Sequence, residues 1–256
     1  MVQTLFNITH SSVGAQLLQA ELGDLQIFYI TEDNLIDVNL VKRGGIPIIF
    51  PQFGEKMGSK KHGFARDIIW DLTEEFKSAD HTKIVYNCLI DESRFFNWKY
   101  NAKLTLEYSV SNTNLNIRFI VENVGSKMFE FTGGLHPYFR IKSRSHININ
   151  GLELIDYIDK RGLKKEFSIS SSDEIERLYL GNSNISFHNG YGNLKITATG
   201  FENWMIWNPG KELTKKIPDL PNDDWNKFIC IEPIIFNNPK KLNPKEKFIG
   251  NLSISL

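Results

Sequence analysis

The feature that most constrains the fold is a strict alternation of apolar and polar side chains. In residues 103–110, Leu104, Leu106, Tyr108 and Val110 fall on one face, and lysine, threonine, glutamate and serine fall on the other. A period of two is typical of an antiparallel strand with one buried face. A chain built on such strands must bury its apolar faces against a second layer, so we expect a sheet packed on a sheet.

Short β-rich runs of this kind recur along the whole chain. We expect strands at 25–30, 83–90, 103–110, 115–121, 193–199, 204–207, 227–231 and 251–256. Many strands at even spacing, without a long linker, predict an all-β fold, namely one large antiparallel β-sandwich that spans residues 1–256 as a single domain.

The segments between these runs carry turn signals. Residues 111–114 and 188–192 suit hairpins, and residues 91–98 and 223–228 each fit one short helical turn. No pattern favours a helix longer than two or three turns. The basic segment 239–247 is expected to be a solvated loop.

Charge and cysteine content exclude several classes of function. Thirty basic residues balance thirty acidic ones, so we expect neither nucleic acid nor a membrane as a partner, and an anionic ligand needs a local cluster of cations. Cys88 and Cys230 lie in apolar runs and have no CxxC partner, which predicts buried thiols and no metal site. No signal peptide or long apolar run is present, and we expect a cytoplasmic protein.

One histidine lies in unusual surroundings. His136 follows Gly133 and Gly134 and precedes Pro137, which favours extended backbone at the histidine. Histidine exchanges a proton near neutral pH, which suits acid–base chemistry. A structural histidine in a turn is the alternative interpretation.

Two segments offer cations beside flexible backbone. In residues 42–54, Arg43 precedes a run of glycine and proline that lacks the spacing of a P-loop. In residues 60–66, Lys61, His62 and Arg66 lie within seven positions. A guanidinium in such a place can bind a carboxylate or phosphate; an exposed basic loop is the alternative.

A single carboxylate interrupts the apolar run 228–236. Burying Glu232 is unfavourable unless it is paired or its pKa rises. A raised pKa is what a general base near neutral pH requires. A buried glutamate with purely structural partners is equally consistent with the sequence.

Taken together, five motifs resemble those of the aldose 1-epimerase superfamily, and most closely its glucose-6-phosphate 1-epimerase branch. They are Arg43-Gly-Gly-Ile-Pro, His62-Gly-Phe-Ala-Arg66, Gly134-Leu-His136-Pro-Tyr, Trp207-Asn-Pro and Cys230-Ile-Glu232-Pro. The resemblance implies the β-sandwich of galactose mutarotase and an isomerase that interconverts the α and β anomers of a sugar without metal or cofactor.

The resemblance also assigns residues. It implies that His136 and Glu232 are catalytic, that Arg43 and Arg66 contact the ligand, including a 6-phosphate, and that His62 and Asp159 lie near the sugar. Lys61 replaces a glutamine that is usual in the branch, which is consistent with a stronger phosphate site, a different sugar, or a side chain in solvent. Pro137 replaces a frequent threonine.

The expected function is anomerisation of a hexose 6-phosphate, with glucose 6-phosphate as the first candidate. We expect Glu232 as base and protonated His136 as acid, on opposite sides of the anomeric carbon and separated by a space the size of a monosaccharide. Tyr138, Phe53 and Trp207 could form an apolar floor. Alternatives are a mutarotase of another sugar and a non-catalytic sugar-binding protein on the same fold. The expected partner is a small sugar or sugar phosphate, and the expected assembly is a monomer or weak dimer.

Overall fold

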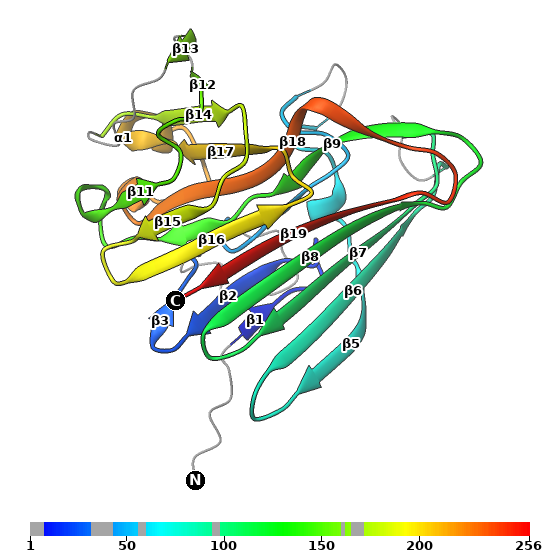
Figure 1. Ribbon diagram of the computed structural model, residues 1–256, viewed down its shortest axis with the longest axis horizontal. Coiled ribbons are helices and arrows are strands. Elements are labelled where there is room, and N and C mark those ends of the chain that lie inside the picture. The colour runs from blue at the N-terminus through cyan, green and yellow to red at the C-terminus, as the bar shows by residue number, and fades with distance from the viewer. Residues whose placement is uncertain (1–7, 32–42, 56–59, 94–97, 160–161, 165–171) are drawn as a thin grey trace.

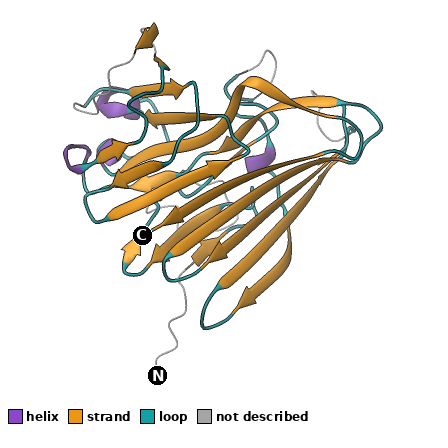
Figure 2. Ribbon diagram, in the orientation of Figure 1, coloured by secondary structure: helices purple, strands orange, loops and turns teal. Residues whose placement is uncertain are grey.

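The computed structural model describes residues 8–31, 43–55, 60–93, 98–159, 162–164 and 172–256, and β-strands dominate it (Figure 1 and Figure 2). Helical structure within these residues is limited to single turns. These are α1 (Gly210–Thr214) and the 3₁₀ turns Ala65–Asp67, Arg144–His146 and Asp224–Asn226. The all-β prediction is therefore confirmed.

Within the described residues, two eight-stranded sheets form the body of the protein. The strands of the first, called the β7 sheet, are, in order, β11 (Asn148–Asn150), β15 (Ile185–His188), β16 (Asn193–Thr199), β19 (Lys247–Ser255), β8 (Asn114–Asn123), β7 (Ala102–Val110), β6 (Thr82–Ile90) and β5 (Asp71–Lys77). Figure 1 shows β6, β7, β8 and β19 running side by side.

The second sheet, called the β18 sheet, positions the candidate site. Its strands are, in order, β13 (Gly162–Lys164), β12 (Tyr157–Asp159), β14 (Ile175–Tyr179), β17 (Asn203–Asn208), β18 (Phe228–Leu242), β9 (Phe129–Leu135) and β4 (Ile48–Ile49), and β10 (Tyr138–Arg140) pairs with β18. A small sheet adds β1 (Ile8–His10), β2 (Leu17–Leu22) and β3 (Leu25–Gln26). All ladders between these strands are antiparallel.

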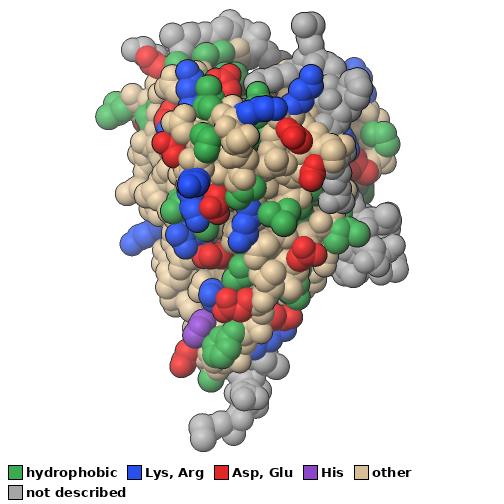
Figure 3. Space-filling view, turned by 90° about the vertical axis from the view of Figure 1, so that its right-hand side faces the viewer, with side chains coloured by type: hydrophobic (Ala, Val, Ile, Leu, Met, Phe, Trp, Pro, Cys, Tyr) green, Lys and Arg blue, Asp and Glu red, His purple; other side chains and the backbone are tan. Residues whose placement is uncertain are grey.

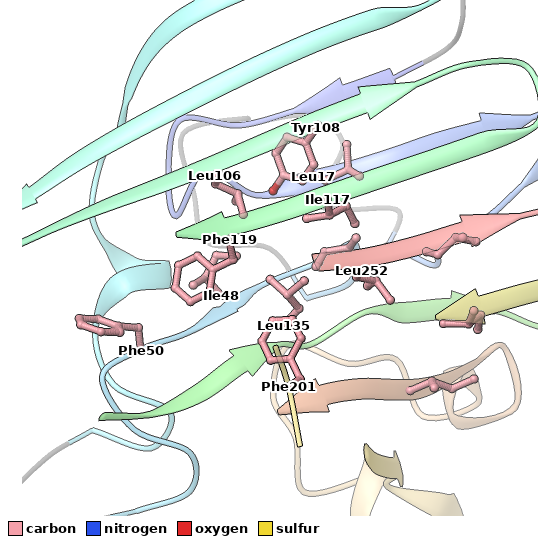
Figure 4. Packing of buried hydrophobic residues seen from close by; sticks show 14 of the residues in the cluster. Leu17, Ile48, Phe50, Leu106, Tyr108, Ile117, Phe119, Leu135, Phe201 and Leu252 are labelled. Atoms are coloured by element: carbon pink, nitrogen blue, oxygen red, sulfur yellow. The ribbon is translucent and has the colours of Figure 1, made fainter. Parts of the chain in front are cut away.

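The main core contains side chains from both large sheets. Alternate residues of β7, among them Leu106 and Tyr108, are fully buried, as the period of two predicts. Figure 4 shows them in one cluster with Ile48 and Leu135 of the β18 sheet. Burying a side chain of this size contributes about 1.5–3 kcal/mol, so this contact between the sheets is a large part of what holds the fold together.

Most sequence-predicted strands are confirmed. Of the predicted strand 25–30, only Leu25–Gln26 is a strand, with isolated bridges at Phe28 and Ile30, and one other segment was predicted wrongly. Residues 193–199 are β16, and residues 83–90, 103–110 and 115–121 lie within longer strands. The expected loop 239–247 is instead largely the end of β18 and the start of β19, with a turn at residues 243–246. Of the two expected helical turns, 223–228 contains Asp224–Asn226, and 91–98 lies partly outside the described residues.

The burial of the two thiols confirms a sequence prediction. On the face shown in Figure 3, basic and acidic side chains are interspersed. Cys88 and Cys230 are both buried and free. Among the described residues, no helix has the length and apolar character needed to cross a bilayer.

The end of β9 depends on a glycine. Gly133 has φ of +140°, and a Cβ built there would lie 2.1 Å from the carbonyl oxygen of Ile49. We therefore expect Gly133→Ala to lower the free energy of unfolding by roughly 2–5 kcal/mol, because torsional strain and a backbone clash add. Denaturant titration measures this change.

Gly54 provides the matched control for this prediction. Its φ is +73°, but a Cβ there meets nothing within 4 Å. Gly54→Ala should show the torsional penalty alone, about 1 kcal/mol. Equal losses in the two variants would contradict the role given to the close approach at Gly133.

Candidate active site

The cavity with the sequence-predicted residues lies on the side of the β18 sheet that faces away from the main core. Its volume is about 390 Å³, within the range of roughly 300–1,000 Å³ typical of small-molecule sites. Its lining residues are Arg43, Phe53, Gly54, Lys61, His62, Arg66, His136, Tyr138, Glu174, Glu176, Met205, Trp207, Leu213, Ile217 and Glu232.

His136 is fixed between β9 and β10. Its backbone N–H donates to the carbonyl of Pro47 at 2.9 Å. Its ring stacks on Tyr138, with centroids 4.8 Å apart and planes 9° from parallel, and meets Trp207 edge-on at 5.9 Å. The side chain is buried, so the imidazole is held in one orientation by aromatic packing.

Glu232 lies in the middle of β18, opposite Met205 of β17. Strand alternation explains its direction: Ile229, Ile231 and Ile235 enter the main core, and the alternate residues face the other way. The residue is 1% exposed. The apolar part of β18 therefore places one acidic side chain, Glu232, in the wall of the cavity.

The two groups are in direct contact. Nε2 of His136 lies 3.5 Å from Oε1 of Glu232. The expectation that a monosaccharide fits between them is wrong, because this distance leaves no room for a sugar ring. Both groups instead lie on the wall of one cavity, from which they can reach the same ligand atom or two neighbouring ones.

Burial governs the protonation of this pair. It raises the pKa of Glu232 well above 4.5, although Lys61 and Arg66 oppose the shift. Burial also lowers the pKa of His136 well below 6.5, and the charges of Arg66 and Arg43 lower it further. In the free protein, burial therefore favours the state in which Glu232 is protonated and His136 is neutral.

Arg43 is held from two sides. Its Nη1 donates to the hydroxyl of Tyr138 at 3.3 Å, and its Nη2 lies 2.9 Å from Oδ1 of Asp219. Asp219 is more than half exposed, and it gives Arg43 a counter-ion at the edge of the cavity. The Tyr138 contact links this cation to the aromatic stack that orients His136.

Lys61 and Arg66 enter the cavity on one short segment. Nη2 of Arg66 donates to the carbonyl oxygen of Lys61 at 2.9 Å, which ties the two residues together. Within the described residues, neither side chain forms an ion pair, whereas neighbouring Lys60 is 2.7 Å from Asp67. Two cations that have no direct ion-pair partner among the described residues therefore face the cavity.

His62 supplies a neutral ring to the same wall. The N–H of Gly54 donates to its Nδ1 at 3.2 Å, so Nε2 carries the hydrogen. Burial, with Arg66 and Lys61, lowers the pKa of His62 to about 3. At neutral pH the imidazole is therefore a hydrogen-bond donor and not a cation.

One sequence-predicted residue is not part of this wall. Asp159 ends β12 and does not line the cavity, so its contact with a sugar remains a prediction. Sequence reasoning missed Glu174 and Glu176, which do line the cavity. Glu176 is an exposed acid on β14, Glu174 directly precedes that strand, and acids in such positions give no signal in the sequence. The pairing of β14 with β17, where Glu176 lies opposite Trp207, brings this segment to the cavity.

Comparison with known proteins gives the same assignment as the motifs. The sequence profile of the aldose 1-epimerase family matches residues 3–255. A candidate glucose-6-phosphate 1-epimerase of Escherichia coli is 28% identical over 245 residues, which cover 91% of this chain and 81% of that protein. One of Cenchrus ciliaris, with the same description, is 26% identical over 83% of this chain and 70% of that protein.

Solved structures share the fold. A crystal structure of a candidate mutarotase from Salmonella typhimurium matches with a TM-score of 0.87 and 22% identity, over 98% of this chain and 87% of that one. Galactose 1-epimerase of Lactobacillus acidophilus matches with a TM-score of 0.67 and 16% identity, over 95% and 89% of the two chains. The chain therefore belongs to the aldose 1-epimerase family and is an isomerase that acts on the anomeric carbon of a sugar.

Proposed function

We propose that this protein interconverts the α and β anomers of a hexose 6-phosphate, with glucose 6-phosphate as the first candidate. The observation that carries the proposal is the contact between His136 and Glu232 in a cavity that also presents Arg43, Lys61 and Arg66. The names of the relatives from Escherichia coli and Cenchrus ciliaris support the same substrate.

The proposed chemistry is a pair of proton transfers. Glu232 takes the proton of the anomeric hydroxyl while His136 gives a proton to the ring oxygen, the bond from the anomeric carbon to the ring oxygen breaks, and an aldehyde forms. After rotation about the C1–C2 bond, the groups exchange roles and the ring closes on the other face. The two oxygens share one carbon, so groups 3.5 Å apart can serve both.

Proton sharing supports this cycle. The state with ionised Glu232 and protonated His136 opens the ring, and the state with the proton on Glu232 closes it. The two states contain the same number of protons, so the cycle needs no exchange with solvent. In the free protein, burial favours the state with the proton on Glu232. This is the protonation state that the pair has in the proposed cycle when the sugar is in its open-chain form.

Exchange NMR tests the proposal directly. Catalytic amounts of protein should increase the exchange between the two anomeric proton signals of glucose 6-phosphate. Absence of exchange with tight binding of the sugar would favour a non-catalytic sugar-binding protein. Faster exchange for free glucose than for the phosphate would favour a mutarotase of a neutral sugar, an alternative supported by Glu174 and Glu176 in the lining.

The phosphate contact gives a sharper test. Because Lys61 faces the cavity without an ion pair among the described residues, we expect Lys61→Gln to lower kcat/KM for glucose 6-phosphate about tenfold, the loss of one charged hydrogen bond of roughly 1.5 kcal/mol. The rate on free glucose should hardly change, so the ratio of the two rates is the measurement.

Lys60→Gln is the matched control for this substitution. Lys60 is the preceding residue, carries the same charge and is paired with Asp67 outside the cavity lining. It should leave the ratio of the two rates unchanged. Equal effects of the two substitutions would remove Lys61 from the phosphate site and leave the acid–base proposal intact.

A further inference from the structure

The acid–base chemistry proposed above leaves one buried reactive group at the site unused. Cys230 lies two residues before Glu232 on β18 and opposite Tyr138 of β10. Residues two apart on a strand point to the same face, so the thiol and the carboxyl group of Glu232 lie on one side of the sheet. Cys230 is fully buried and free of any disulfide.

The fold brings three metal-ligand atoms together at this point. One ligand atom each from His136, Cys230 and Glu232 lies within 4.8 Å of the other two. Oε2 of Glu232 and Nδ1 of His136 are buried without a hydrogen-bond partner in the described residues. Such atoms are unfavourable in a protein interior unless something satisfies them.

The ligand set has a clear chemical preference. A thiolate, an imidazole and a carboxylate are ligands of Zn²⁺, and three protein ligands with a fourth position open to a cavity are typical of accessible zinc sites. One thiolate and one carboxylate balance the two charges of the ion. His136 and Glu232 line the cavity, which provides a route for entry.

We propose that His136, Cys230 and Glu232 form a binding site for a thiophilic divalent cation such as Zn²⁺. On binding, the thiol and the carboxyl group release their protons to solvent, and sulfur, nitrogen and oxygen each donate a lone pair to the ion. The ion then occupies both groups of the proposed acid–base pair, so bound metal inhibits anomerisation. The fixed charges of Arg43, Lys61 and Arg66 repel the ion and limit its affinity.

Cobalt provides a readout that does not depend on activity. Co²⁺ bound to a thiolate gives an intense sulfur-to-metal charge-transfer band, and Zn²⁺ should remove the band by displacing Co²⁺. The chain has two cysteines, so in Cys88→Ser the sole remaining thiol is Cys230. We expect this variant to keep the full band, and absence of the band would overturn the proposal.

Cys230→Ser is the complementary variant. It should lose the cobalt band, and its anomerisation rate, relative to its own metal-free rate, should resist Zn²⁺ that abolishes activity in the wild type. A band that persists, or inhibition that is unchanged, would contradict the proposal. If Cys230→Ser does not fold, Cys88→Ser decides alone.

The inhibition measurement rests on the proposed function, whereas the spectroscopic one does not. A protein without activity on glucose 6-phosphate can still show the cobalt band, so failure of the function and failure of the metal site are distinguishable. In an active wild-type protein, EDTA should restore the rate after Zn²⁺. Inhibition that EDTA does not reverse would count against coordination at this site.

Discussion

Glu232→Gln is expected to lower kcat/KM for anomerisation by about 10²–10⁴, the usual contribution of one positioned proton transfer. The amide has nearly the shape of the carboxyl group but cannot take a proton from the anomeric hydroxyl. The position is fully buried on a central strand and lies 3.5 Å from His136, so the substitution should leave the backbone in place. Exchange NMR with glucose 6-phosphate measures the loss.

The same substitution should stabilise the folded protein at neutral and alkaline pH. The pKa of Glu232 is raised well above 4.5 by burial, so folding takes up a proton at any pH between 4.5 and the raised value. In that interval the contribution of Glu232 to stability falls as pH rises, by at most about 1.4 kcal/mol per pH unit. Glutamine does not titrate, so the advantage of the variant should grow with pH.

Unfolding titrations at pH 5 and pH 8 test the sign of this effect. The gain in free energy of unfolding should be small at pH 5 and larger at pH 8. Glu212→Gln is the control, because Glu212 is exposed and Lys215 lowers its pKa. This variant should keep the wild-type rate and show no gain in stability that grows with pH. A gain for Glu232→Gln that is greater at pH 5 would contradict the raised pKa.

The body of the fold could be predicted because local patterns match burial. In β7, apolar side chains at every second position are the ones that the structure buries. The end of β18 could not be predicted, because a proline (Pro239) followed by two lysines is typical of a solvated loop. The ladder between β18 and β9 is irregular between Ile235 and Lys240, and a proline without an N–H is tolerated where a ladder is interrupted.

The candidate site was predictable as a set of residues but not as an arrangement. Glu232 is conspicuous as one acid in an apolar run, and His136 as a histidine after two glycines. Their contact depends on the pairing of β18 with β10 and β9 across nearly a hundred positions. The metal-ligand set of His136, Cys230 and Glu232 could not be predicted for the same reason, because sequence spacing reveals only ligands that are close in the chain.

His136→Gln provides the second large effect and tests whether the pair acts as a unit. The amide of glutamine can contact Glu232 but cannot carry the transferred proton, so we expect a loss in kcat/KM of about 10²–10⁴, similar to that of Glu232→Gln. In the proposed cycle one group takes a proton from the sugar while the other, 3.5 Å away, gives one to it, so removal of either group stops both transfers.

The rate of the double variant His136→Gln, Glu232→Gln should therefore lie within a few-fold of the rate of the slower single variant. The reason is that the losses in rate caused by removing residues that act as a unit are strongly non-additive. The measurement is the set of four exchange rates for glucose 6-phosphate, with circular dichroism to verify that each variant folds. If the two losses multiplied, each group would work independently of the other. The coupling of the two proton transfers, and with it the role of the short distance between the imidazole and the carboxyl group, would then have to be abandoned.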